Sequence, residues 1–266
     1  MISVIAQKLD IYPEDGKHPF ARTGELSLFH LKKAGATGTL IGHSEVGESA
    51  AAVKQKLTAA WDAGLTHNIV LFGDQWEDLG KPWSELDEVH QARVIEIVRE
   101  KFLAISQGIP AQCIEKTVFA YEPAWSVSGS GRSSVPLASV DQIERIASVL
   151  RNTLKDSYGV AAAKNTRIVY GGSMSPARTK EIMAIAEIDG FGAGHDSTKT
   201  LWVKEMAAGM AGVKKDRRAV FFLNWKAYEL KEPYEAFVEI LQPFSKSMDI
   251  YLAPPATDIA MLAQLV

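Results

Sequence analysis

Short apolar runs rich in β-branched residues alternate along the chain with longer segments of helical periodicity. Runs of this length with few polar positions are typical of strands buried on both faces of a parallel sheet. The pattern predicts eight strands, at Ile2–Gln7, Thr39–His43, Ile69–Asp74, Thr117–Glu122, Arg167–Gly171, Ile188–Gly194, Ala219–Asn224 and Asp249–Ala253.

The segments between these runs place apolar side chains three and four residues apart, which predicts amphipathic helices that pack against the strands. We expect these apolar stripes to build the core and to carry no chemistry. A final helix is predicted to start at Thr257 and Asp258 and to end near Val266. The clearest stripes are Val94, Ile97, Val98, Phe102 and Ile105, then Ile143, Ile146, Ala147, Leu150 and Leu154, and a shorter one of Phe237, Ile240 and Leu241.

Eight strand–helix units share the 266 residues, about 33 residues each, and such alternation predicts parallel crossover connections. We therefore expect an α/β fold in one domain over residues 1–266, a closed (β/α)₈ barrel. A doubly wound open sheet is the alternative, but the first predicted strand lacks the G-x-G-x-x-G turn of dinucleotide-binding proteins. The stretch Ser128–Gly131 follows a strand and matches that motif only weakly.

Charge balance and cysteine content narrow the classes of function. With 29 basic and 32 acidic side chains the net charge is −3, so nothing points to a nucleic-acid partner. No apolar run reaches the length of a membrane span, and Met1–Val4 lack the features of a signal peptide. Cys113 is the single cysteine, and no Cys/His cluster has the spacing of a zinc site. We expect a cytoplasmic protein without membrane contact or bound metal.

Polar residues and glycines stand at the C-terminal ends of the otherwise apolar runs. In a closed parallel barrel these ends meet on one face, where the active sites of this fold are built. Packing alone does not require this pattern, so it favours acid–base chemistry beside an anion site. The residues are Gln7, His43, Asp74, Glu122, the Gly-Gly-Ser of 171–173, Gly194, His195 and the Asn-Trp-Lys of 224–226.

Three of these side chains suit proton transfer. Partial desolvation would raise the pKa of Glu122 toward neutrality and make it a general base. A neutral His43 could donate a hydrogen bond to a substrate carbonyl, and Lys226 could stabilise negative charge on oxygen. Each also has a structural alternative: a Glu122 paired with a basic neighbour, a structural His43, and a solvated Lys226 at the surface.

Two glycine-rich turns follow neighbouring strands. The first is Tyr-Gly-Gly-Ser at 170–173, and the second contains Gly192, Gly194, Ser197 and Thr198. Glycine lets backbone N–H groups approach an anion closely, and a helix N-terminus adds a favourable dipole. Tight turns without a ligand are the alternative, but two such turns on one face favour a phosphate site.

Taken together, these motifs resemble the triosephosphate isomerase family, whose fold is the TIM barrel. The resemblance rests on Asn-Trp-Lys at 224–226, Gly-His-Ser-Glu at 42–45, Tyr-Glu-Pro-Ala-Trp at 121–125 and Tyr-Gly-Gly-Ser at 170–173, and it covers nearly the whole chain. It implies an aldose–ketose isomerase of glycolysis and gluconeogenesis that needs no metal or organic cofactor. The default substrates are glyceraldehyde 3-phosphate and dihydroxyacetone phosphate.

The resemblance also implies a role for each site residue. Glu122 would move the proton between two carbons. His43 would polarise the carbonyl and shuttle protons between the two oxygens, and Lys226 with Asn224 would stabilise negative charge. The lid Pro123–Gly131 would close over the substrate and exclude water. The phosphate would be held by Gly172, Ser173, Gly194 and His195 with Ser128 and Gly129 of the lid, while Ser44 and Glu45 would support the site.

The order of the motifs differs from that of the family, because Asn-Trp-Lys lies near the C-terminus of this chain and not near its beginning. The chain resembles a circularly permuted member that starts at the family's third strand, with Gly212–Arg218 joining the old ends. Surface termini that lie close together make such rewiring easy. The segment Lys8–Arg22 differs from the family loop that reaches into a partner subunit, so a homodimer is possible and not assured.

Other differences from the family pattern leave the identity of the substrate open. The phosphate turn contains His195 and Asp196 where the family has a second glycine and a small residue, and Asp196 would repel a phosphate unless it points away. The alternatives are an isomerase of a related four-carbon sugar phosphate, a tetrulose phosphate, and a weakly active permuted barrel that only binds phosphate.

Overall fold

The computed structural model describes residues 1–11, 24–127 and 137–266. Eight strands lie in these residues, and each coincides with a run predicted from the sequence. Their bounds are β1 (Ile2–Val4), β2 (Leu40–Ile41), β3 (Ile69–Phe72), β4 (Val118–Tyr121), β5 (Arg167–Tyr170), β6 (Gly190–Ala193), β7 (Ala219–Asn224) and β8 (Met248–Ala253).

The strands form one parallel sheet that closes on itself. Their order is β1-β8-β7-β6-β5-β4-β3-β2, and every ladder between neighbours in this order is parallel. A parallel bridge between Ala6 and Thr39 joins the two outer strands. There the N–H of Ala6 donates to Gly38 O at 2.9 Å and the N–H of Leu40 donates to Ala6 O at 2.8 Å. The predicted (β/α)₈ barrel is confirmed.

Several strands were predicted too long at their C-terminal ends. The run Thr39–His43 contains only β2, because Gly42 adopts a φ of +82° and turns the chain out of the ladder. Gln7, Asp74 and Glu122 likewise follow the last residues of their strands. Their side chains are therefore free to contact groups on neighbouring loops.

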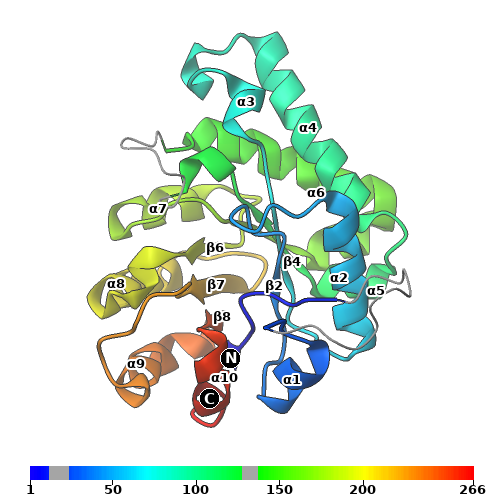
Figure 1. Ribbon diagram of the computed structural model, residues 1–266. Helices are drawn as coiled ribbons and strands as arrows, with labels where there is room; N and C mark the ends of the chain where they lie inside the picture. The colour runs from blue at the N-terminus through cyan, green and yellow to red at the C-terminus, as the bar shows by residue number, and fades with distance from the viewer. Residues whose placement is uncertain (12–23, 128–136) are drawn as a thin grey trace.

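Helices surround the barrel on its outside (Figure 1). The connection between β3 and β4 holds three helices where one was expected, because Gly80 ends the first with a φ of +69° and Pro110 precedes the third. The bounds are α1 (Leu28–Lys33), α2 (Ala50–Asp62), α3 (Trp76–Leu79), α4 (Glu88–Ser106), α5 (Ala111–Lys116), α6 (Val140–Asn165, broken at Gly159), α7 (Pro176–Ala184), α8 (Thr200–Ala211), α9 (Tyr234–Leu241) and α10 (Ile259–Ala263).

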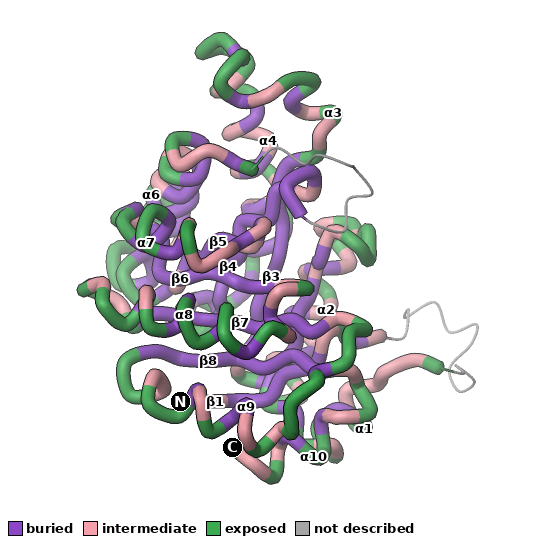
Figure 2. The backbone as a smooth tube through the Cα atoms, turned by 90° about the vertical axis from the view of Figure 1, so that its left-hand side faces the viewer, coloured by how far each residue is buried: buried purple, intermediate pink, exposed green. Residues whose placement is uncertain are grey.

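The strands are buried (Figure 2), and they separate two apolar layers of the core. Along β3, Ile69 and Leu71 belong to an inner cluster, whereas Val70 and Phe72 belong to an outer cluster shared with the helices. This alternation is what a strand buried on both faces requires. The predicted helical stripes are confirmed as core, with Ile97 and Ile240 only partly buried.

The last helix was predicted with the wrong bounds. A 3₁₀ turn at Ala256–Asp258 precedes α10, which ends at Ala263 and not near Val266. The side chain of Asp258 does not cap the helix, because its Oδ2 accepts a hydrogen bond from the Tyr234 hydroxyl at 2.7 Å.

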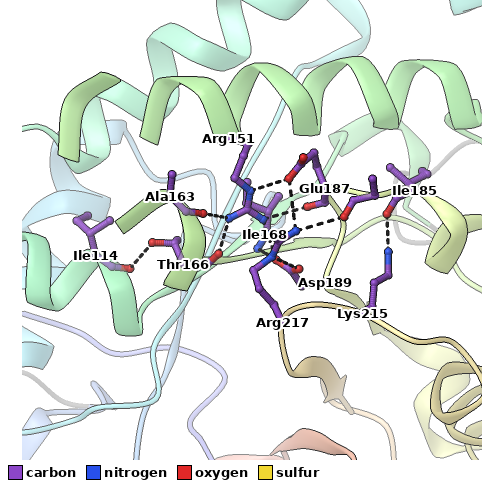
Figure 3. A network of polar contacts seen from close by, with 11 residues as sticks. Ile114, Arg151, Ala163, Thr166, Ile168, Ile185, Glu187, Asp189, Lys215 and Arg217 are labelled. Carbon is purple, nitrogen blue, oxygen red and sulfur yellow. Dashed lines mark hydrogen bonds and ion pairs between the residues drawn. The ribbon is translucent and has the colours of Figure 1, made fainter. Parts of the chain in front are cut away.

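A buried ion-pair network ties the N-terminal ends of β5 and β6 together (Figure 3). Asp189 is fully buried; Arg151 Nη2 donates to its Oδ2 at 2.9 Å and Arg217 Nε donates to its Oδ1 at 2.5 Å. Glu187 Oε2 also accepts from Arg151 Nε at 2.9 Å. Arg217 belongs to the connector Gly212–Arg218, so this segment is fastened to the barrel.

The two termini lie side by side at one end of the molecule (Figures 1 and 2). The N–H of Ile250 donates to Met1 O at 2.8 Å, and α10 packs against β1. Across the described residues, no helix combines the length and the apolar character that crossing a membrane requires.

Candidate active site

A cavity opens at the C-terminal ends of the strands and holds about 350 Å³ of space including its open mouth. Residues from the ends of β2, β4, β5, β6 and β7 meet there, as the sequence predicted. The walls are His43, Leu71, Glu122, Val127, Gly171, Gly172, Ser173, Gly192, Ala193, Gly194, Phe222, Asn224 and Lys226.

Glu122 follows β4 and is 2% exposed. The N–H of Ser44 donates to its Oε2 at 2.9 Å, and its Oε1 lies 3.3 Å from Nε2 of His43. Burial raises the pKa of the Glu122 carboxyl above its ordinary value, although His43, Ser44 and Lys226 all act in the opposite direction. A carboxylate that is costly to keep ionised is a stronger base than one in water.

The contacts of His43 define its tautomer. The N–H of Glu45 donates to Nδ1 at 3.2 Å, so Nδ1 carries no hydrogen. A neutral ring then carries its hydrogen on Nε2, which is the nitrogen that faces Glu122. The imidazole is therefore oriented as a hydrogen-bond donor toward the cavity.

Lys226 and Asn224 come from the end of β7, on the other side of the cavity. Nζ of Lys226 lies 2.5 Å from Oε1 of Glu45. The backbone N–H of Lys226 donates to Oδ1 of Asn224 at 3.0 Å. Glu45 therefore contacts both His43 and Lys226, and Ser44 contacts Glu122. Ser44 and Glu45 thus lie in contact with the residues that they were predicted to support.

The first glycine-rich turn lines the cavity, but one of its N–H groups is already engaged. A Cβ at Gly172 would lie 2.2 Å from the Tyr170 hydroxyl, so the turn is closed to larger residues. The N–H of Ser173 donates to Ser126 O at 2.9 Å. The Ser173 N–H could donate to a phosphate only after its hydrogen bond to Ser126 breaks. The sequence predicted a free N–H here, and this expectation is corrected.

In the second turn, Gly194 lines the cavity but His195 does not. The exposed His195 ring packs edge-on against Tyr228 with centroids 4.3 Å apart. Asp196, which the sequence marked as a possible obstacle to phosphate, pairs with Nζ of Lys199 at 2.7 Å. Its charge is compensated outside the cavity wall.

The predicted lid residues Ser128 and Gly129 lie outside the described residues. The segment leading to them is anchored, because Trp125 Nε1 donates to Oδ2 of Asp74 at 2.6 Å. The Tyr121 hydroxyl donates to the other oxygen of Asp74 at 2.7 Å, and burial raises the pKa of this carboxyl. Asp74 therefore holds the first residues of the predicted lid and is not among the walls of the cavity.

The amino-acid sequence is similar to that of a known protein family. The family model described as triosephosphate isomerase matches residues 1–208. The chain belongs to the triosephosphate isomerase family. A triosephosphate isomerase of Emericella nidulans is 33% identical over 187 residues, 69% of each chain. One of Hyphomonas neptunium is 36% identical over 184 residues, 67% of this chain and 66% of the relative. A third, of Lactobacillus delbrueckii subsp. bulgaricus, is 36% identical over 174 residues, 64% of this chain and 63% of the relative.

The family match ends before β7, so it contains His43 and Glu122 but neither Asn224 nor Lys226. The structure brings the two parts together, because β7 pairs with β6 on one side and with β8 on the other. The chain thus carries the Asn-Trp-Lys motif beyond the matched region and still places it at the cavity that the matched region forms.

Some residues of the site were missed by the motifs. Leu71 and Phe222 form apolar walls of the cavity, and the inward alternation along β3 and β7 was the signal that could have identified them. Val127, which lies within the predicted lid Pro123–Gly131, contributes another wall. Gln7, which the sequence placed at a strand end without a role, contacts the backbone of Lys226.

A second hollow, here called the side hollow, lies on the other side of Glu122 and His43. It holds about 770 Å³ of space including its mouth. It shares His43, Leu71 and Glu122 with the first cavity. Its remaining walls come from the start of α2, the end of β3 and α4: Gly42, Ser44, Gly47, Glu48, Ser49, Ala50, Val53, Phe72, Gly73, Gln75, Lys101 and Ile105.

Proposed function

We propose that this chain interconverts an aldose and a ketose sugar phosphate by proton transfer, with glyceraldehyde 3-phosphate and dihydroxyacetone phosphate as the default pair. One observation carries the proposal: a buried carboxyl with a raised pKa, Glu122, lies 3.3 Å from the hydrogen-bearing nitrogen of His43. Relatives that share about a third of their aligned residues with this chain carry the name triosephosphate isomerase.

In the proposed reaction the Glu122 carboxylate removes a proton from the carbon beside the carbonyl. The electrons of that C–H bond form the enediolate double bond, and negative charge develops on the carbonyl oxygen. The Nε2–H of His43 donates to this oxygen, and the ammonium of Lys226 stabilises the charge. His43 passes its Nε2 proton to this oxygen and takes the hydroxyl proton from the oxygen on the neighbouring carbon, which becomes the new carbonyl. Glu122 returns the carbon-bound proton to that neighbouring carbon, so both residues are regenerated and no electrons leave the substrate.

The phosphate would occupy the end of the cavity formed by Gly172, Ser173 and Gly194. These residues are supplied by loops after β5 and β6, so the phosphate would lie opposite the loop of His43. Ser128 and Gly129 of the predicted lid belong to the same phosphate-site prediction and lie outside the described residues. Water in the cavity would weaken every electrostatic contact to the enediolate, so its exclusion would strengthen these contacts.

The side hollow favours a second candidate substrate, a four-carbon sugar phosphate. It lies next to Glu122 and His43 and is larger than the cavity itself. A further hydroxymethyl group would have room there once the Glu122 carboxylate moved toward the substrate. A barrel that only binds phosphate is the third candidate, and the same assay separates it from the other two.

The experiment is a coupled assay of the purified protein on glyceraldehyde 3-phosphate and on a tetrulose phosphate, beside the Glu122→Gln variant. We expect turnover of the triose phosphate that is lost in the variant. A higher kcat/KM on the tetrulose phosphate would select the four-carbon candidate. Phosphate binding by a folded protein that turns over neither substrate would contradict the isomerase proposal.

We further infer that the chain is a circularly permuted member of its family. The support is that the match ends at residue 208, whereas β7 and β8 lie beyond it and complete the barrel between β6 and β1. A reconnected chain that starts at Asp216, links Val266 to Met1 and ends at Lys215 keeps every residue, Arg217 included, and tests this inference. We expect the same fold and unchanged isomerase kinetics, and a reconnected chain that does not fold would contradict it.

The homodimer and the cytoplasmic location that the sequence predicted stay predictions. A single chain without a partner tests neither of them. Sedimentation of the purified protein would decide the first.

A further inference from the structure

Lys226 has an unusual backbone conformation. Its φ is +53°, and among the described residues it is the only non-glycine residue with a positive φ. Residues with a β-carbon avoid this left-handed region unless surrounding contacts hold them there. Since Lys226 supplies the ammonium of the proposed site, whatever holds its backbone also decides where that ammonium lies.

The Lys226 backbone is held from both sides. Its N–H donates to Asn224 Oδ1 at 3.0 Å. Its C=O accepts from Nε2 of Gln7 at 2.6 Å, and the same nitrogen donates to Ala253 O at 3.0 Å. The Gln7 amide therefore bridges the C-terminal ends of β7 and β8 from a position just after β1.

The side chain of Lys226 depends on this backbone. A Cβ placed at Gly194 would lie 3.3 Å from Cε of Lys226, so the lysine stem passes directly over the glycine. Nζ is then in contact with Glu45 at 2.5 Å. If Lys226 relaxed to a negative φ, its side chain would point elsewhere. It would lose both its position over Gly194 and its contact with Glu45.

We propose that Gln7 is a positioning residue for Lys226. Its amide holds the Lys226 carbonyl and so maintains the left-handed backbone that directs the ammonium into the cavity. This inference rests on the proposed function, in which Lys226 stabilises the enediolate. Gln7 also lines a shallow hollow beside His43 and Lys226, so the competing role is direct contact of Gln7 with the substrate.

The test is a double-mutant cycle of Gln7→Met and Lys226→Ala. Methionine keeps the length of glutamine and removes both amide donors. Lys226→Ala should impair both substrate binding and turnover. In the wild-type background we expect Gln7→Met to lower kcat/KM by roughly 10- to 100-fold, mostly through kcat, because a small displacement of a catalytic group is costly. In the Lys226→Ala background we expect less than about a twofold further loss, because no ammonium is left to misplace.

Asn68 offers a matched control. Its Nδ2 donates to Leu65 O at 2.7 Å, so it is also a side-chain amide that holds a backbone carbonyl, but it precedes β3 at the opposite end of the barrel. Asn68→Leu should lower stability and leave kcat/KM unchanged. An equal loss from Gln7→Met in both backgrounds would show direct substrate contact or a general structural role, and would overturn the proposal.

A crystal structure of the Gln7→Met protein tests the inference independently of turnover. We expect Lys226 to leave the left-handed region and its Nζ to separate from Glu45. A Lys226 that keeps its φ and its contact with Glu45 would overturn the positioning role. Absence of turnover in the wild-type protein would instead count against the proposed function, and the crystallographic result would still decide the role of Gln7.

Discussion

Two buried carboxylates stand at opposite ends of the same barrel, and their surroundings differ in kind. Asp189, at the N-terminal ends of the strands, contacts two guanidinium groups, those of Arg151 and Arg217. Glu122, at the C-terminal ends, contacts the imidazole of His43 and one backbone N–H. Burial raises the pKa of Glu122 above its ordinary value and keeps the carboxyl reactive, although His43, Ser44 and Lys226 act in the opposite direction. One end of the barrel thus uses a carboxylate for cohesion, and the other keeps one available for chemistry.

The largest expected effect is on turnover in the Glu122→Gln variant. We expect kcat to fall by about 10³-fold, because the general base is removed. The free energy of unfolding at pH 7 should change by less than about 1 kcal/mol, because loss of a buried charge offsets loss of one accepted hydrogen bond. Steady-state kinetics and urea unfolding of the same preparation measure both quantities. A variant that kept its activity would remove Glu122 from the mechanism.

The opposite outcome is expected for Asp189→Asn. The buried Arg151 and the partly buried Arg217 would be left beside a neutral amide, so the free energy of unfolding should fall by about 3 kcal/mol. The kcat/KM of the folded variant should stay within about twofold of the wild-type value, because the site lies at the other end of the strands. Urea unfolding and the coupled assay test this. A large loss of kcat without loss of stability would break the division between the two ends.

A smaller effect on turnover is expected for His43→Gln. Glutamine can still donate a hydrogen bond, but it cannot move a proton between the two substrate oxygens. We expect kcat to fall by about 10²-fold with KM nearly unchanged. A rise in KM matched by an equal fall in kcat/KM, with kcat unchanged, would assign His43 to substrate binding instead.

The smallest expected effect is a pH dependence of kcat/KM and of stability that comes from Glu122, at the C-terminal ends of the strands. Glu122 must be ionised to act, so the acid limb of kcat/KM should have its midpoint above pH 4.5, the ordinary pKa of Glu. Because the folded state holds this proton more tightly than the unfolded state, its contribution to stability is complete below pH 4.5 and declines as pH rises through the raised pKa. Glu122→Gln should remove that decline. An acid limb at or below pH 4.5 would contradict the raised pKa.

The sequence predicted the barrel well because its strands are buried on both faces. A short, continuous apolar run such as Ile69–Phe72 indicates a buried strand directly, whereas the ends of strands depend on local geometry such as the left-handed Gly42. The three helices between β3 and β4 were missed, although Gly80 and Pro110 were visible as breaks. Helix number within a crossover is set by such local breaks and not by the apolar period.

The site was predicted less completely, for two physical reasons. Glycines and charged residues at strand ends identified the members of the cavity, but side-chain direction does not follow from sequence position. His195 follows Gly194 directly, yet its ring packs on Tyr228. Gln7 contacts a residue 219 positions away, and no local pattern signals such a contact.

Isomerisation in deuterium oxide tests the central claim most directly. Dihydroxyacetone phosphate is converted by the purified protein, and the carbon-bound deuterium in the glyceraldehyde 3-phosphate formed is measured by mass spectrometry. The account predicts deuterium at C2, because a proton held by the Glu122 carboxyl can exchange with solvent before it returns to carbon. It also predicts neither conversion nor exchange with Glu122→Gln. Conversion without any deuterium, or undiminished exchange in the variant, would contradict proton transfer by Glu122.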